Sequence, residues 1–474
     1  MKLSGNLALD RSNQRSLQTQ LTGQLMRMIQ SGDLLAGEHL PSTREMAQAL
    51  RISRNTVVAA YEMLVGEGYL ESQLRSGFQV GSAARAFQLL PVNPKAAKRR
   101  TKPAALPSAP LPFRPTQPDV NLLSMQIWNR HRARALKRES SLLHYQSRFP
   151  VGLDELRQNV AAYLRDSRAV RCEWQQVAIT SGSQQALFLL AHLLLRPGQR
   201  VYVEDPGYAG ARDAWNHAGA IVAPAPVDKE GLRLPERAAK GSLIYVTPSH
   251  QFPLGVCMSL ARRLSLLRAA RTWQAWIVED DYDGEFRYES APQPSLQSLD
   301  EERRVIYIGS FSKTLFPSLR IGYVVLPPEL VEGFAVLKAI ADNHGPLVDQ
   351  ATLAGFLESG AFYSHLRRCR KLYAERQGYF LQQAARQGLP LHFPITGRGL
   401  NLAGMLPDGA NDRTWSLRLR DAALDVPPLS SYAVGPVRPG LLFGLSAFNR
   451  HAIQSGVTAI ARVFEGAFKG SSAL

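Results

Sequence analysis

The residues best suited to covalent chemistry lie around Lys313. This lysine follows the short apolar run 305–308, and it stands among Ser310, Ser312 and Arg320. A lysine amine forms a Schiff base with an aldehyde once nearby cations or a dry site lower its pKa. Hydroxyls and a guanidinium at these offsets suit a phosphate monoester. The segment therefore favours a ligand with both an aldehyde and a phosphate, and pyridoxal phosphate (PLP) has both.

A run of acids follows another apolar segment, residues 276–278. Asp280 lies in this run, with Asp281 and Tyr282 directly after it. A carboxylate beside a pyridine nitrogen keeps that nitrogen protonated, whereas acids at the carboxyl edge of a strand can also bind Mg²⁺. Because the chain has no GxxxxGK[ST] loop, which would hold nucleotide phosphates, the pyridine role is favoured and no metal site is predicted.

Ser181, Gly182 and Ser183 form a third candidate, between a predicted strand and a predicted helix. The N–H groups at such a helix start attract an anion, and a plain tight turn is the alternative interpretation.

The elements that must hold these groups follow from the apolar pattern. Short runs rich in β-branched residues predict buried strands at 177–180, 201–203, 243–246, 276–278, 305–308 and 323–325. Helical patterns lie between several of them, for example at 184–195 and 260–270. This alternation predicts an α/β fold around a largely parallel sheet.

Residues 1–83 predict a separate module. The spacing of apolar residues between 21 and 28 predicts an amphipathic helix, and Ser42 with Glu45 forms a capping-box pattern that begins a second helix. Ser53 can cap a third helix after a short turn, with Val57 and Tyr61 facing inward. Alternation over 74–80 predicts a hairpin. The pattern is that of a winged helix-turn-helix, whose second helix enters the major groove of DNA.

Residues 84–118 predict a linker between this module and a body of residues 119–474, because they hold eight prolines and a basic cluster. The net charge of the chain is +17, and residues 86–150 carry twelve Lys and Arg against two acids, a net +10. This stretch is either a source of phosphate contacts or a solvated linker with an exposed helix.

The remaining composition excludes several classes of protein. The three cysteines are scattered and form no metal or disulfide pattern. The longest apolar run is too short to span a membrane, and the N-terminus lacks the apolar core of a secretory signal. We therefore expect a cytoplasmic protein with no membrane partner.

Residues 37–80 resemble the GntR-type winged helix almost throughout. The resemblance implies double-stranded DNA as a partner. It implies DNA contacts by Arg44, Ser53, Arg54, Asn55, Thr56 and the wing, which includes Arg75 and Gly77. The alternative for Arg44 and Arg54 is a solvated charge at a helix start.

The body carries TSGSQQAL (180–187), VEDPGY (203–208), TPSHQFPLG (247–255), VEDDYDGEFRY (278–288) and YIGSFSKTLFPSLRIGYVVLP (307–327), in this order. These segments resemble fold-type I aminotransferases. Together with the N-terminal module they resemble the MocR regulators, which include GabR-like and PdxR-like proteins and fuse a GntR-type winged helix to an aminotransferase-like domain.

The MocR resemblance implies a role for each candidate in PLP binding. Lys313 is the Schiff-base lysine, Asp280 pairs with the pyridine nitrogen, and Asp281 is the one-residue alternative. Tyr282 bonds the phenolic oxygen of the ring and Tyr208 stacks on the ring, with core packing as the alternative for both. The phosphate is held by Ser181, Gly182, Ser183, Ser310, Ser312 and Arg320.

The sequence departs from working aminotransferases in three places. Leucines occupy residues 440–446 where an arginine that clamps the substrate carboxylate is expected, although Arg438 and Arg450 flank the stretch. Phe252 precedes Pro253 where asparagine is common, and Ala169 stands where glycine is frequent. These departures weaken the case for transamination and leave PLP binding untouched.

Two functions remain open. The favoured one is a homodimeric transcription regulator whose body senses PLP or an amine or amino-acid effector, since such a switch needs a ligand that binds one conformation better than the other. The alternative is an active PLP-dependent aminotransferase with an accessory DNA-binding head. The effector, the operator and the sign of regulation cannot be read from the sequence.

Overall fold

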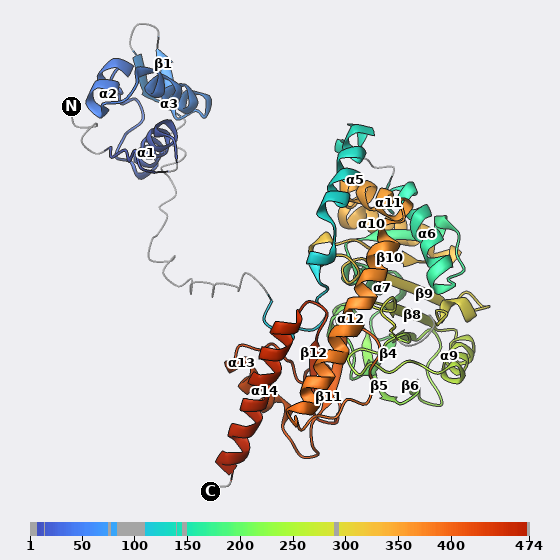
Figure 1. Ribbon diagram of the computed structural model, residues 1–474. Helices are drawn as coiled ribbons and strands as arrows, with labels where there is room; N and C mark the ends of the chain where they lie inside the picture. Colours follow the sequence, from blue (N-terminus) through green and yellow to red (C-terminus); the bar gives the residue numbers. More distant parts are fainter. Residues whose placement is uncertain are drawn as a thin grey trace. The chain divides into compact units, whose positions relative to one another are not determined.

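The computed structural model describes residues 7–13, 15–73, 77–82, 110–138, 140–144, 149–288 and 293–471 (Figure 1). The chain divides into two compact units, Met1–Leu106 and Pro107–Leu474. Among the helices within the described ranges, none combines the length and apolar composition that crossing a lipid bilayer requires.

The described N-terminal unit contains three helices followed by a hairpin: α1 (Leu17–Ser31), α2 (Thr43–Leu50), α3 (Arg54–Gly66), β1 (Leu70–Gln73) and β2 (Gly77–Val80). The predicted capping box is present, because the Ser42 hydroxyl accepts the Glu45 N–H and the Glu45 carboxylate accepts the Ser42 N–H. The Ser53 hydroxyl accepts the Asn55 N–H and begins α3.

The core of this unit lies between the helices and the hairpin. Val57 and Tyr61 are fully buried on the inner side of α3, as predicted, and the Tyr61 ring meets Phe78 edge-on at 5.0 Å. The two strands are antiparallel, with Gln73 opposite Gly77. These elements confirm the winged helix-turn-helix.

A mixed sheet forms the centre of the C-terminal unit. Its order in the described residues is β3 (Val177–Thr180), β10 (Gly322–Val325), β9 (Val305–Ser310), β8 (Trp276–Asp281), β7 (Leu243–Val246), β4 (Arg200–Asp205), β5 (Ile221–Asp228) and β6 (Gly231–Leu232). All six predicted strands lie in it. Strands β5, β4, β7, β8 and β9 are parallel. Strand β10 is antiparallel to both neighbours, because the connection from β9 is too short for a crossover helix.

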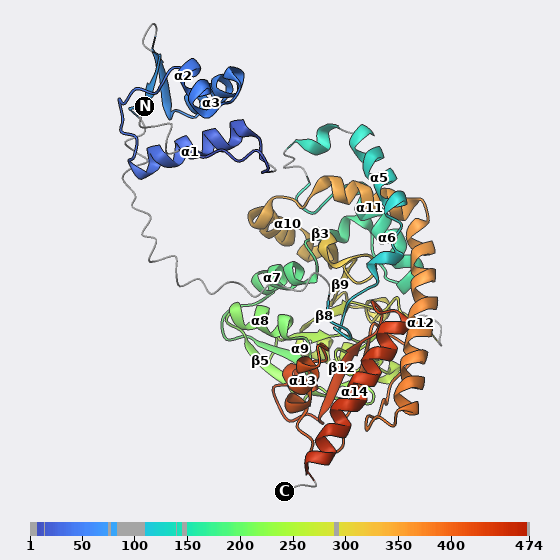
Figure 2. The same cartoon turned by 60° about the vertical axis from the view of Figure 1, so that its left-hand side comes forward.

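Helices cover both faces of the sheet (Figure 2). One face packs against α7 (Ser183–Leu194), α8 (Ala209–His217) and α10 (Pro328–Asp342). The other packs against α6 (Asp154–Arg168), α9 (Leu260–Trp273) and α11 (Leu347–Glu358), and α5 (Met125–Arg138) lies against α11. Burial on two sides explains why the strands are almost continuously apolar.

The last part of the chain builds a smaller layer: α12 (Ala361–Arg386), β11 (Asn401–Met405), α13 (Asp412–Asp421), β12 (Gly440–Gly444) and α14 (Arg450–Ser471). Strands β11 and β12 pair with each other, and α12 and α14 lie side by side in both views (Figures 1 and 2).

The predicted linker ends earlier than residue 118. Residues 110–118 pack on this smaller layer, and the ring of Phe113 is fully buried against Phe380, Phe443 and Phe448. Its prolines predicted extended backbone, which gives no sign of this long-range aromatic contact. Residues 84–109 of the predicted linker lie outside the described residues.

Candidate functional site

A cavity of about 490 Å³ lies at the carboxyl ends of the central strands. Ligands of α/β sheets bind at this edge. Eight of the ten predicted cofactor residues line the cavity: Ser183, Tyr208, Asp280, Tyr282, Ser310, Ser312, Lys313 and Arg320. The other two, Ser181 and Gly182, adjoin it through Arg320.

Asp280 is buried at the end of β8 and lines the cavity. The Tyr245 hydroxyl donates to its Oδ2 at 2.8 Å, whereas Oδ1 is buried without a hydrogen-bond partner. Burial raises the pKa of this carboxyl to about 7. A buried acceptor without a partner costs free energy, so Asp280 offers a ready site for a donor held in the cavity.

Asp281 points to the opposite face of the sheet, as alternation along a strand requires. It pairs with Arg168, at 2.6 Å between Nη2 and Oδ2, and it accepts the Tyr307 hydroxyl at 2.5 Å. Both partners of this ion pair are buried. Of the two neighbouring acids, Asp280 is the one whose side chain lines the cavity.

Lys313 lies across the cavity on the segment after β9. Its Nζ donates to the Thr116 carbonyl at 3.2 Å. Burial lowers the pKa of the amine, with a smaller lowering from Arg320, while Asp283 and Asp280 oppose the shift. A lowered pKa increases the neutral, nucleophilic fraction of the amine, which Schiff-base chemistry needs.

Groups that could bind an anion lie together at one end of the cavity. Gly182 caps the start of α7 with φ +87°, and Ser183 is the first residue of the helix. The helix start contributes N–H groups and a favourable dipole. Arg320 lies against it and donates from Nη2 to the Ser181 carbonyl at 2.7 Å. A side chain at position 182 would meet this guanidinium, because its Cβ would lie 2.9 Å from Nη2.

Two serines complete the same end. The Ser310 hydroxyl accepts the Ser312 N–H at 3.2 Å, and the Ser312 hydroxyl is buried without a partner. Hydroxyl, guanidinium and helix N–H groups are the donors that a phosphate monoester requires.

Tyr208 and Tyr282 lie on the walls of the cavity. The Tyr208 hydroxyl donates to Gln184 Oε1 at 3.0 Å. The Tyr282 hydroxyl lies 3.0 Å from His250 Nδ1, which is 2.9 Å from both oxygens of the buried Asp283. Burial raises the pKa of both tyrosines, so both remain neutral phenols at ordinary pH.

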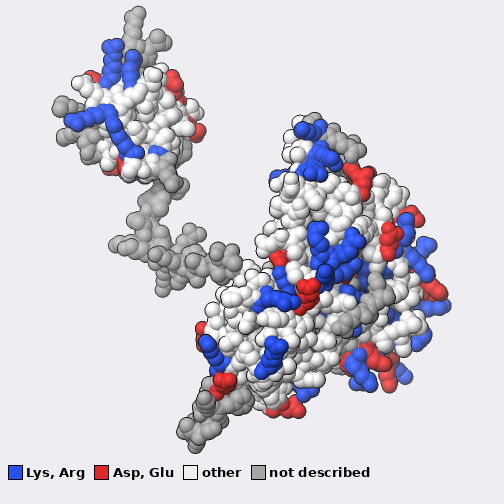
Figure 3. All heavy atoms as spheres, viewed as in Figure 1, with Lys and Arg blue, Asp and Glu red and all other residues white. Residues whose placement is uncertain are grey.

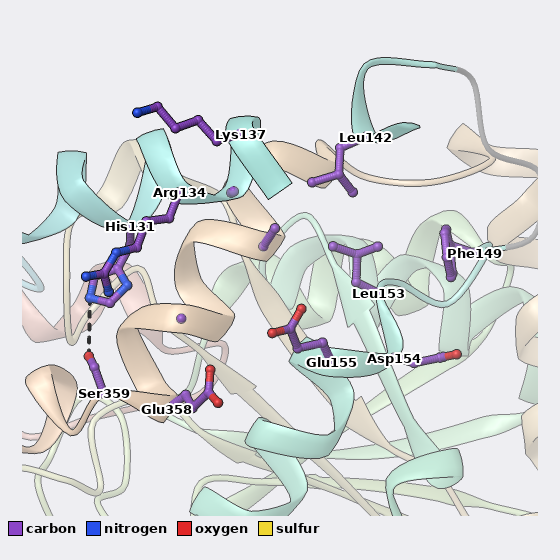
Figure 4. A pocket seen from close by; sticks show the side chains of 13 residues that line it. His131, Arg134, Lys137, Leu142, Phe149, Leu153, Asp154, Glu155, Glu358 and Ser359 are labelled. Atoms are coloured by element: carbon purple, nitrogen blue, oxygen red, sulfur yellow. Dashed lines mark hydrogen bonds between the residues drawn. The ribbon is translucent and has the colours of Figure 1, made fainter. Parts of the chain in front are cut away.

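A larger cavity, of about 1010 Å³, lies between α5, α6 and α11 (Figure 4). Basic side chains of α5, including Arg134 and Lys137, line one side of it, and the carboxylates of Glu155 and Glu358 line the other. His131 Nε2 lies 3.3 Å from the Ser359 hydroxyl. None of the predicted site residues lines this cavity.

The predicted DNA contacts lie at the starts of α2 and α3. Arg44, Ser53, Arg54 and Asn55 are exposed, and Thr56 is half-buried. Figure 3 shows Arg side chains across the visible face of this unit and acidic side chains at its edges. Gly77 is exposed at the start of β2 with φ +87°, and Arg75 lies outside the described residues.

Each of the two units of the chain matches a known family. Residues 17–80 match the bacterial regulatory proteins of the gntR family, and residues 129–393 match aminotransferase class I and II. The chain is 36% identical to the probable rhizopine catabolism regulatory protein MocR of Rhizobium meliloti, over 97% of this chain and 96% of that protein. The chain belongs to the MocR subfamily of GntR regulators.

Two further likenesses agree with this MocR membership. The pyridoxine biosynthesis transcriptional regulator PdxR of Corynebacterium glutamicum is 31% identical, over 94% of this chain and 96% of that protein. The structure of LysN, the α-aminoadipate aminotransferase of Thermus thermophilus, is 28% identical with a TM-score of 0.69, and the match covers 76% of this chain and 93% of that one. The body therefore has the fold-type I aminotransferase architecture.

This MocR-type chain lacks the aminotransferase carboxylate clamp at the expected place. Leu442 is fully buried there, in an apolar cluster with Phe252 that borders Tyr208 and Tyr432. Arg438 pairs with Asp408 at 3.3 Å, and Arg450 lies over the Tyr379 ring at 5.1 Å. Neither arginine is among the residues that line the cavity.

Several residues of the site were missed by sequence reasoning. Tyr245, His250 and residues 114–117 all contact or line the cavity region. Tyr245 lies in a predicted strand, and its contact with Asp280 depends on the register between β7 and β8, which the sequence alone does not give. His250 lies in the quoted TPSHQFPLG segment, but no local pattern indicates that it faces Tyr282.

Proposed function

We propose that this MocR-type regulator binds PLP through Lys313 and regulates transcription in response to PLP itself or to an amine or amino-acid effector. The observation that carries the cofactor is the unpartnered, buried Oδ1 of Asp280, which lines the same cavity as the amine of Lys313 and the anion-binding end at Arg320.

The residues present fit PLP group by group. Asp280 would accept the pyridinium N–H, Tyr208 would pack on the ring, and Tyr282 would lie beside the phenolic oxygen. The phosphate would be held by Ser181, Gly182, Ser183, Ser310, Ser312 and Arg320. Bound PLP supplies an aldehyde for amines and an electron-poor ring. The LysN structure contains N-(5′-phosphopyridoxyl)-L-leucine, which supports a pyridoxyl phosphate ligand for this architecture.

Side chains of the protein would position the cofactor. Asp280 keeps one carboxylate oxygen free for the pyridine nitrogen while Tyr245 fixes the other oxygen. Burial keeps the Lys313 amine closer to its neutral form. Arg320 orders the turn before α7 through the Ser181 carbonyl and keeps a cationic side chain at the phosphate end.

For the N-terminal unit we propose double-stranded DNA as the partner. Arg54 and Asn55 at the start of α3, together with the wing, would contact the DNA. We further propose a cytoplasmic homodimer. Aminotransferase-type bodies are usually dimers, and a two-fold assembly presents two reading heads to paired half-sites.

The buried Leu442 supports regulation over the alternative, an active aminotransferase. A substrate carboxylate placed against Phe252 would lose its hydration at an apolar wall, because Leu442 stands behind it where the arginine is expected, and an unpaired buried charge is costly. Turnover of an α-amino acid with a keto acid is the direct test of that alternative, and we expect none above background.

A DNase footprint tests the proposal. The purified protein is placed on the DNA that flanks its own gene, with and without PLP, and Lys313→Ala is the control. We expect wild-type protection to change with PLP and mutant protection to stay constant. If PLP changes neither pattern, amines are screened on the PLP-loaded protein; if they too change nothing, the sensing function is refuted. Absence of any protected site there or elsewhere in the genome would refute DNA regulation itself.

A further inference from the structure

An N-terminal arm, residues 7–13, lies along α1 in the N-terminal unit. Its first residue is buried in the core of this unit. Two glutamines of α1 hold the backbone that follows. Gln24 accepts the Ala8 N–H and donates to the Ala8 carbonyl, and Gln20 makes the same pair of bonds with Asp10. The path of the arm is therefore fixed by its contacts with α1.

The arm reaches the turn of the helix-turn-helix. There Arg11 donates from Nη2 to the Arg51 carbonyl at 2.7 Å. Arg51 is the first residue after α2, so this carbonyl lies at the helix end that carries a partial negative charge. Ser53, the N-cap of α3, follows two residues later. The guanidinium of Arg11 is therefore held beside the turn that leads into the helix proposed to contact DNA.

Arg51 has a backbone conformation that favours glycine. Its φ is +52° and its ψ is +44°, in the left-handed region that residues with a Cβ rarely adopt. Its side chain is exposed, so packing does not explain why arginine occupies this position. Strained backbone of this kind is concentrated at functional sites. A charge that is needed at this turn would explain the arginine.

The charges at this turn lack acidic partners. No carboxylate in the described part of the chain forms an ion pair with Arg11 or Arg51. Asp10 precedes Arg11, and its carboxylate accepts the N–H and the hydroxyl of Ser12 at 2.8 and 2.6 Å. Arg54, a predicted DNA contact, is also exposed. A guanidinium has five N–H donors, so both Arg11 and Arg51 keep donors for an anion.

We propose that Arg11 and Arg51 bind the phosphate backbone of DNA beside the groove that α3 enters. This inference rests on the proposed function, because it requires the N-terminal unit to bind duplex DNA. Neither residue is among the DNA contacts that the GntR resemblance implies. Phosphate oxygens accept from guanidinium donors, and each neutralised phosphate releases condensed counterions. Such contacts carry no sequence information, so they raise the affinity for any duplex.

The alternative is a structural role, in which Arg11 caps α2 and Arg51 is a solvated charge. The two roles differ in their response to salt and to DNA sequence. Loss of a phosphate contact lowers the slope of log affinity against log salt by about one, on every duplex alike. Loss of a cap that positions α3 would weaken binding to the operator and leave that slope unchanged.

Fluorescence-anisotropy titrations of the full-length protein at several salt concentrations measure both quantities. Each protein is titrated with two duplexes, the DNA that flanks its own gene and a duplex of equal length and composition in scrambled order. The variants are Arg11→Gln, Arg11→Lys, Arg51→Gln and the double glutamine variant. Arg27→Gln, on α1, controls for the loss of an exposed arginine from the same unit. Hydrogen exchange in α2 and α3 shows whether each variant keeps its fold.

We expect Arg11→Gln and Arg51→Gln each to lower affinity about five-fold at about 0.15 M salt, and the slope by about one, on both duplexes. The double variant should lower the slope by about two. Arg11→Lys and Arg27→Gln should keep the wild-type slope.

If either glutamine variant keeps the wild-type slope while α2 and α3 stay protected, or weakens binding to the flanking duplex alone, the inference is wrong. If Arg11→Gln loses protection, the slope of Arg51→Gln decides, because that side chain is exposed. Wild-type protein that binds neither duplex refutes the proposed DNA partner instead.

Discussion

Replacing Asp280 with asparagine should stabilise the cofactor-free protein at high pH while it weakens PLP binding. The carboxyl is buried, and one of its oxygens has no partner. Asparagine keeps an oxygen that can accept the Tyr245 hydroxyl and removes the charge. The substitution therefore tests whether this carboxylate is held in place for a ligand at the expense of stability.

The magnitude follows from the pKa of Asp280. Burial raises that pKa from the ordinary 3.8 to about 7, and each unit corresponds to about 1.4 kcal/mol. Below pH 4 the carboxyl is protonated in both the folded and the unfolded protein. Between pH 4 and pH 7 only the unfolded chain releases the proton, so folding stability falls as the pH rises. The full loss above pH 7 is about 4 kcal/mol.

Asparagine does not titrate, so Asp280→Asn removes this loss. Its amide adds one buried donor, at a cost of about 1–3 kcal/mol that does not depend on pH. The difference in unfolding free energy between variant and wild type should therefore rise by about 3–4 kcal/mol from pH 4 to pH 8. Glu279, whose pKa burial also raises to about 7, is present in both proteins and cancels. Burial and, to a smaller extent, the charge of Asp280 raise the pKa of Glu204 to about 7, so removal of that charge adds a smaller gain of the same sign.

Urea unfolding of the cofactor-free, full-length protein at pH 4, 6 and 8 measures the effect. All six tryptophans lie between residues 128 and 415, so their fluorescence reports on the C-terminal unit alone. Asp281→Asn is the matched control. It leaves Arg168 buried without its carboxylate, and breaking such a pair costs about 3–5 kcal/mol. If Asp280→Asn gains nothing relative to wild type between pH 4 and pH 8, the reasoning from the buried carboxyl is refuted.

Two further predictions use matched pairs in other parts of the chain. Arg54→Ala should lower operator affinity and reduce the slope of log affinity against log salt by about one. Arg27→Ala, which removes an exposed arginine of α1, should change neither quantity. If fluorescence-anisotropy titrations give equal slopes for the two variants, the assignment of α3 as the helix that contacts DNA is contradicted. Gly182→Ala should weaken PLP binding at least ten-fold, because its Cβ would press on Arg320. Gly198 has a similar φ of +85°, and no atom lies near the Cβ that alanine would add there. Gly198→Ala should therefore lower stability and leave PLP affinity unchanged. If the two variants bind PLP with equal affinity in absorbance titrations, the assignment of Gly182 to the phosphate-binding end is contradicted.

The secondary-structure elements, and the meeting of Lys313 and Asp280 at one cavity, were predictable because their signals are local. The short β-branched runs predicted six strands of the sheet, all of which are present. Lys313 and Asp280 come at or directly after two of these strands, and parallel strands bring their carboxyl ends to one edge of the sheet. The cap at Ser42 was predictable for the same reason, since both of its partners lie within one turn of helix.

The choice between neighbouring residues needed long-range contacts. Asp280 and Asp281 are both buried acids, and only the contacts with Tyr245 and Arg168 distinguish the acid that lines the cavity from the acid in the structural ion pair. Likewise, the predicted role of Tyr282 gave no sign of His250, which lies on a different segment. The local sequence does not indicate which strands are neighbours in the sheet.

Residues 110–118 show the same limit. Eight prolines predicted an extended linker over residues 84–118, and composition cannot show that Phe113 inserts into the C-terminal layer while Thr116 reaches Lys313. A linker that ran to residue 118 would make no contact with the C-terminal unit. Instead, the last residues of the predicted linker line the cavity. Local rules can be broken at functional sites, and here a proline-rich segment with two left-handed residues, Phe113 and Thr116, lies beside Lys313, the candidate Schiff-base residue. The Lys313 amine donates to the Thr116 carbonyl, so the candidate Schiff-base residue and the segment that leads towards the N-terminal unit meet at this peptide group, and a ligand that binds the amine covalently would change this contact.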